Sequence, residues 1–180
     1  MLYLTVKGRE LYDSENNRFI DVKTQTIQLE HSLVSISKWE AKWKKPFLSN
    51  KTMSVEETVD YIRCMTITQN VNPYLYFCID DDNVKEVTAY VYDPMTATWF
   101  SKDEKKSPNR AVYTSEVIYW QMITLGIPFE CQKWHLNRLL TLIHVCNEKN
   151  TPPKKLSGRE LANRNRALNA ARRKKYNSRG

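Results

Sequence analysis

Apolar or β-branched residues recur at short intervals in two N-terminal stretches, residues 2–6 (LYLTV) and 19–29 (FIDVKTQTIQL). This pattern is typical of β-strands. The run DSENN between them consists of residues that favour turns. The pattern therefore predicts a β-hairpin over about residues 2–29, with a loop longer than the tight two-residue type.

After residue 31 the apolar spacing changes to that of a helix. Apolar side chains now follow at i, i+3, i+6 and i+10, namely at Leu33, Ile36, Trp39 and Trp43. Ser32 is suited to cap the start of this helix, and Pro46 to stop it.

A second helix is predicted from Ser54, because Glu57 follows it at the spacing of a capping box. One side of this helix would carry Val55, Val59, Ile62 and Met65. Residues 74–92 are ambiguous: YLYFCI fits either a strand or the start of a helix, whereas DDNVKEVTAYVY is typical of a short capped helix.

The strongest helical pattern covers residues 114–150. Thr114 or Ser115 would cap a helix that ends at Gly126, ahead of Pro128. A second helix is predicted from Phe129 to residue 150, with a broad apolar face. We expect the two to form a central helical hairpin (about 114–148) joined by the Gly-Ile-Pro link.

These elements predict an α+β fold that is mainly α, with an N-terminal β-hairpin packed on four to five helices. Residues 1–150 would form one globular domain, with the hairpin at about 2–29 and a helical body at 32–150. Residues 151–180 would be a basic tail, partly helical or disordered until a partner orders it.

Composition adds a core and constrains the compartment. The apolar fraction is 41%, which is sufficient for a core. No apolar run reaches the roughly 20 residues of a transmembrane helix, and the N-terminus has no secretory pattern. We therefore expect no membrane partner, and four reduced cysteines at Cys64, Cys78, Cys131 and Cys146.

The net charge of +8 is concentrated at the C-terminus. Residues 151–180 carry +9, and the first 150 residues carry −1. Such a tail can bind nucleic acid or an acidic protein, or it can simply be a solvated end. The candidate contact residues are Lys154, Lys155, Arg159, Arg164, Arg166, Arg172, Arg173, Lys174, Lys175 and Arg179.

No motif makes a catalytic or cofactor case. Cys131, His135, His144 and Cys146 are of metal-ligating types, but on one straight helix the first and last would lie about 22 Å apart. Core packing is the favoured interpretation of these residues. Asp80–Asp82 precede a predicted helix, which favours capping over a cation site. We predict a non-enzymatic protein without cofactor or metal.

Two tryptophans are candidates for a protein interface. Trp43 and Trp99 flank lysine-rich polar stretches, and exposed tryptophans are frequent anchors of protein–protein contacts. The other three tryptophans are expected in the core.

Four segments resemble one protein family: EHSLVSISKWEAKWKKPFL (30–48), DYIRCMTITQNV (60–71), MTATWF (95–100) and EVIYWQMITLGIPFECQKWHLNRLLTLIHVC (116–146). They are similar to a small tail-morphogenesis protein of long-tailed bacteriophages, most like a tail assembly chaperone. The resemblance covers most of residues 25–175 and rests on overall pattern.

The resemblance implies a small, helical, non-enzymatic protein in the cytoplasm of the infected bacterial host. Its partners would be the tape-measure protein and tail-tube subunits, and self-association stays open. The alternative is a DNA-binding structural or capsid- or neck-associated virion protein that acts through the basic tail. A third hypothesis is an enzyme with a site around Cys131 and His135.

Overall fold

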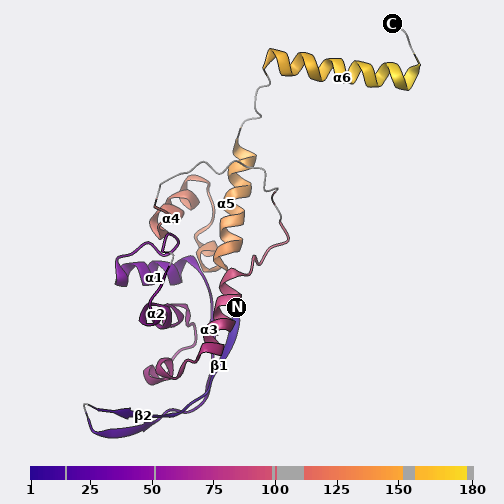
Figure 1. Ribbon diagram of the computed structural model, residues 1–180. Coiled ribbons are helices and arrows are strands. Elements are labelled where there is room, and N and C mark those ends of the chain that lie inside the picture. The colour runs from indigo at the N-terminus through magenta and orange to yellow at the C-terminus, as the bar shows by residue number, and fades with distance from the viewer. Residues whose placement is uncertain (15, 51, 99, 101–111, 152–156, 178–180) are drawn as a thin grey trace. The chain divides into compact units, whose positions relative to one another are not determined.

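The N-terminal residues form a long antiparallel hairpin in the computed structural model, which describes residues 1–14, 16–50, 52–98, 100, 112–151 and 157–177 (Figure 1). Strand β1 (Leu2–Val6) pairs with β4 (Gln25–Leu29), and β2 (Glu10–Asp13) pairs with β3 (Arg18–Asp21). The predicted hairpin is confirmed, but its second arm is two strands rather than one, and the prediction missed β2.

The break between the two pairs of strands is explained by Gly8. A Cβ atom at this position would lie 1.8 Å from the carbonyl oxygen of Val22, so only glycine allows the two arms to approach here. The Gly8 N–H donates to Thr24 Oγ1 at 2.9 Å, and the Val22 N–H to the Arg9 carbonyl at 3.1 Å. The arms therefore stay joined across a local irregularity.

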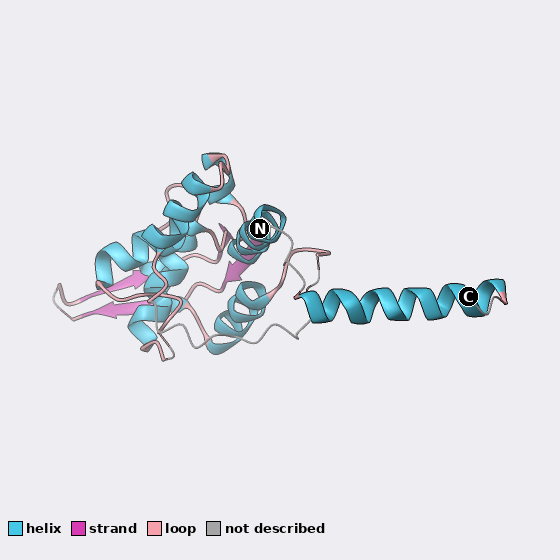
Figure 2. Ribbon diagram, turned by 90° about the horizontal axis from the view of Figure 1, so that it is seen from above, coloured by secondary structure: helices cyan, strands magenta, loops and turns pink. Residues whose placement is uncertain are grey.

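Helices make up most of the rest of the chain, and strands are confined to the hairpin (Figure 2). The fold is thus α+β and mainly helical, as predicted. The helices, with short 3₁₀ segments marked η, are α1 (Leu33–Trp43), α2 (Val55–Met65), η1 (Pro73–Cys78), α3 (Asp81–Tyr92), α4 (Ser115–Thr124), η2 (Phe129–Lys133), α5 (Leu136–Asn150) and α6 (Gly158–Tyr176).

The core forms between the inner face of the hairpin and the helices. Leu4 of β1 is opposite Ile27 of β4, and both side chains are fully buried. Helix α3 lies against β1, while α1 packs against α2 and α4. Trp39 of α1 is fully buried, which confirms the helical period predicted there.

The ambiguous region around residues 74–92 is helical throughout. Asn72 caps η1, its side chain accepting from the Tyr74 N–H. Asp80 caps α3, its carboxylate accepting the Asn83 N–H at 2.8 Å. The predicted capping role at the start of the acidic run is therefore confirmed for Asp80.

The second helix of the predicted 114–148 hairpin begins at Leu136 rather than Phe129. Residues Phe129–Lys133 form a 3₁₀ turn, and His135 makes an isolated bridge with Ser32. The Leu136 N–H donates to the His31 carbonyl at 2.7 Å. This long-range pairing holds the chain extended before α5, so Cys131 and His135 do not share a helix.

The chain divides into two compact units, Met1–Asn147 and Glu148–Gly180. The first contains the hairpin, the core and nearly all of α5. The second contains α6, a helix of 19 residues. Each unit is described separately below.

Candidate binding groove

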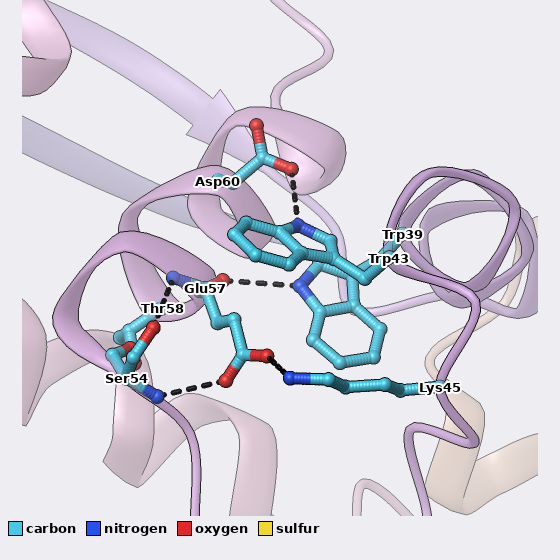
Figure 3. Close-up of polar contacts among 7 residues, drawn as sticks. All are labelled: Trp39, Trp43, Lys45, Ser54, Glu57, Thr58 and Asp60. Carbon is cyan, nitrogen blue, oxygen red and sulfur yellow. Dashed lines mark hydrogen bonds and ion pairs between the residues drawn. The ribbon is translucent and has the colours of Figure 1, made fainter.

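Helices α1 and α2 are joined by two tryptophan side chains (Figure 3). The indole N–H of Trp39 donates to the Glu57 carbonyl at 3.0 Å. The indole N–H of Trp43 donates to Asp60 Oδ2 at 2.8 Å. Because Trp43 is only half-buried, one face of its ring remains available beside α2.

The start of α2 is fixed by the predicted capping box, which is confirmed (Figure 3). The Glu57 N–H donates to Ser54 Oγ at 3.1 Å, and the Ser54 N–H donates to Glu57 Oε2 at 2.8 Å. Lys45, from the loop after α1, donates to the other oxygen of the Glu57 carboxylate. The Lys45 hydrogen bond, followed by the Ser54 N–H, holds the pKa of Glu57 below its ordinary value.

These contacts position a surface groove of about 720 Å³ between α1, α2 and η1. Its apolar lining comes from all three elements: Trp43, Val55, Val59, Tyr74, Phe77 and Ile79. Val55 is 81% exposed and Phe77 is 67% exposed. Large exposed apolar side chains gathered in one groove are typical of a protein interaction site.

The rim of the groove carries both signs of charge. Lys42 and Asp60 form an ion pair on one wall. Arg63 lies over the ring of Tyr76, 5.3 Å from its centroid, and Glu56 is also part of the lining. A partner in the groove would therefore meet apolar walls with an orienting polar border.

A separate cluster of buried titratable groups surrounds His31. Its Nδ1 shares a hydrogen bond of 2.5 Å with the Tyr61 hydroxyl, and its ring centroid lies 5.0 Å from that of His135. The Nε2–H of His135 donates to the Tyr90 carbonyl at 3.0 Å, since that oxygen can only accept. The Tyr90 hydroxyl donates to Glu30 Oε1 at 2.6 Å.

Burial dominates the electrostatics of this cluster. Desolvation, followed by the proximity of His135, lowers the pKa of His31 to about 3. Desolvation also lowers the pKa of His135. Both imidazoles are therefore neutral at pH 7 and act as hydrogen-bonding parts of the core. A cavity of about 310 Å³ adjoins His31 and is lined by a different face of α2 from the groove.

The predicted metal and nucleophile candidates are dispersed. Cys131 is buried in η2, and His135 is engaged with Tyr90. All four cysteines are free thiols. Among the described residues, no group of three or more His, Cys, Asp or Glu side chains could hold a metal ion.

Of the two predicted interface tryptophans, Trp43 lines the groove, whereas Trp99 lies outside the described residues. Seven of the predicted basic contact residues are on α6, and their side chains are exposed: Arg159, Arg164, Arg166, Arg172, Arg173, Lys174 and Lys175. Lys154, Lys155 and Arg179 lie outside the described residues.

Sequence reasoning missed most of the groove. Val55 was assigned to the buried side of α2, although it is largely exposed. A signal was available in the aromatic run at Tyr74–Phe77, since four consecutive bulky residues in a short segment cannot all turn inward. Tyr76 is buried and Phe77 is exposed.

Comparison of the chain with protein-family models, with curated proteins and with solved structures found no match. No helix in the described ranges is long and apolar enough to cross a membrane.

Proposed function

We propose that this chain is a non-enzymatic assembly chaperone of a long-tailed bacteriophage, acting in the cytoplasm of the infected bacterium. It binds the tape-measure protein and tail-tube subunits while the tail is built. The resemblance of residues 30–48, 60–71, 95–100 and 116–146 to such chaperones supports this proposal. The structural observation that carries it is the apolar groove between α1, α2 and η1.

The groove suits a helical partner. An amphipathic helix can place apolar side chains at i, i+3, i+4 and i+7 into an apolar groove. Phe77 and Tyr74 offer aromatic surface to such anchors, and Trp43 forms the opposite wall. The charges at the rim would set the orientation of the partner more than its affinity. A long helical protein such as the tape measure presents many segments of this kind.

The test measures binding of the full chain to the tape-measure protein encoded in the same genome, by co-expression, pull-down and titration calorimetry. Val55→Asp places a charge in the groove, but it also places an acid in the first turn of α2, where acids favour the helix. Phe77→Ala removes an exposed aromatic ring. Both variants should fold and bind at least tenfold more weakly.

Trp120→Ala is the matched control, because Trp120 is an aromatic residue of similar exposure (63%) outside the groove. It should bind like the wild-type chain. If the full chain does not bind the tape-measure protein, or if Val55→Asp and Phe77→Ala bind normally, the proposal is wrong.

A further inference from the structure

Helix α6 carries a dense set of exposed positive charges. It spans 19 residues, which corresponds to a length of about 28 Å at 1.5 Å per residue. Seven of its exposed residues are basic, and Glu160 is its only acidic residue. Because like charges repel, such a helix is stabilised by a polyanionic partner.

The spacing places three arginines on one face of α6. Arg159, Arg166 and Arg173 are seven residues apart, so each is offset by only about 20° from the next. Arg166 and Arg173 line one surface hollow together with Asn169 and Ala170. The small alanine lets a partner approach the helix backbone between the guanidinium groups. We call this the Arg159–Arg166–Arg173 face.

The other basic residues extend the charge around the helix. At 100° per residue, Arg164, Arg172 and Lys175 lie on the side opposite the Arg159–Arg166–Arg173 face. A partner that touches only one side of α6 would leave these three charges unused. A groove with phosphates on both walls can contact the two sides at once.

The chemistry of α6 favours nucleic acid over an acidic protein. Its large apolar side chains are limited to Leu161, Leu168 and Tyr176, which is too few for the apolar centre of a protein interface. Its polar residues are arginines and asparagines, which bind phosphate oxygens and base edges. The major groove of B-form DNA is about 12 Å wide and admits an α-helix, whereas that of A-form RNA is too narrow.

We propose that α6 binds double-stranded DNA, with the helix in the major groove and the Arg159–Arg166–Arg173 face as its principal phosphate-binding surface. This proposal does not depend on the apolar groove of the first unit, and each can fail without the other. Binding through phosphates predicts a modest affinity with strong dependence on salt.

The experiment uses the full chain and a fluorescein-labelled 20-base-pair duplex of mixed sequence, with fluorescence anisotropy measured between 50 and 200 mM NaCl. If about four phosphates are neutralised, the logarithm of the binding constant should fall with the logarithm of salt with a slope of about −3.6. The triple variant Arg159→Gln/Arg166→Gln/Arg173→Gln should bind at least tenfold more weakly, with a slope shallower by about 2.7.

The matched control is Arg164→Gln/Arg172→Gln/Lys175→Gln, which removes the same charge from the opposite side of α6. It should lose clearly less affinity than the first triple variant. Glutamine favours helix as well as arginine does, so circular dichroism should show equal helix content in both. Equal losses in the two variants would mean that net charge alone binds DNA, and would overturn the assignment of the face.

Two competitors test the choice of partner. An RNA hairpin of equal length and a poly-glutamate peptide should each compete at least fivefold less well than unlabelled duplex DNA. Equal competition by the RNA would overturn the major-groove placement. Equal competition by poly-glutamate, or absence of DNA binding at 50 mM NaCl, would overturn the proposal as a whole.

Discussion

Replacing Glu40 should destabilise the first unit more than any other single charged residue of α1, because this carboxylate closes two distant backbone positions. Glu40 is 8% exposed. One carboxylate oxygen accepts the Phe47 N–H at 2.8 Å, in the loop after α1. The other accepts the Ser115 N–H at 2.8 Å, at the start of α4. Thr114, the residue in the N-cap position, makes no side-chain cap of its own.

The size of the effect follows from these two bonds. A hydrogen bond to a charged group contributes about 1.5–3 kcal/mol, and a buried donor left without a partner incurs its full desolvation cost. Glu40→Ala removes both acceptors, so we expect a loss of about 3–5 kcal/mol. Glu40→Gln keeps one acceptor oxygen but turns an amide N–H₂ toward the other donor, so its loss should be about 2 kcal/mol. Small domains are stable by only about 5–15 kcal/mol, so either change is large.

The assay is urea unfolding at pH 7.5, followed by tryptophan fluorescence, since Trp39 is fully buried beside Glu40. The midpoint should shift while the slope with urea stays constant. Glu86→Ala is the matched control, because Glu86 is an exposed residue within α3, and its change should lie within about 0.5 kcal/mol. If Glu40→Ala were no less stable than Glu86→Ala, the carboxylate would not be the cap of α4.

Two further outcomes follow from the hairpin and the histidine cluster. Because the pKa of His31 is lowered to about 3 in the folded chain, the unfolded chain alone binds that proton below its ordinary pKa of about 6.5. Stability should therefore be complete above pH 6.5 and fall by up to about 1.4 kcal/mol per pH unit as the pH drops toward 3. Urea midpoints between pH 7.5 and 5 would reveal the decrease, and a constant midpoint would contradict it. Gly8→Ala should lower the melting temperature, because its Cβ would lie 1.8 Å from the Val22 carbonyl oxygen, whereas Gly158→Ala meets nothing within 4 Å and serves as control. Equal melting temperatures for the two variants would refute the close approach at Gly8.

Local patterns predicted the features that neighbouring residues decide. The capping box at Ser54 and Glu57, the stop before Pro46 and the strand at residues 2–6 all depend on side chains within a few positions of one another. The uneven distribution of charge was likewise legible, because it is a property of composition. Helix α6 and its exposed basic side chains agree with that part of the sequence analysis.

Local patterns failed where a distant segment supplied the partner. Phe129–Lys133 has the apolar spacing of a helix, yet the pairing of Leu136 with His31, more than one hundred residues away in sequence, delays the start of α5. Thr114 has the chemistry of a cap, yet Glu40 provides the hydrogen bond. A period of apolar residues carries no information about such contacts.

The sequence by itself therefore determined the class of the fold, the main helices and the separation of a neutral body from a basic C-terminal segment. Only the tertiary structure decided which apolar residues are left at the surface. Val55 and Phe77 belong to elements with buried neighbours, and their exposure depends on how α1, α2 and η1 pack. The physical reason is that secondary structure responds to neighbours along the chain, whereas a groove exists only between elements that the fold brings together.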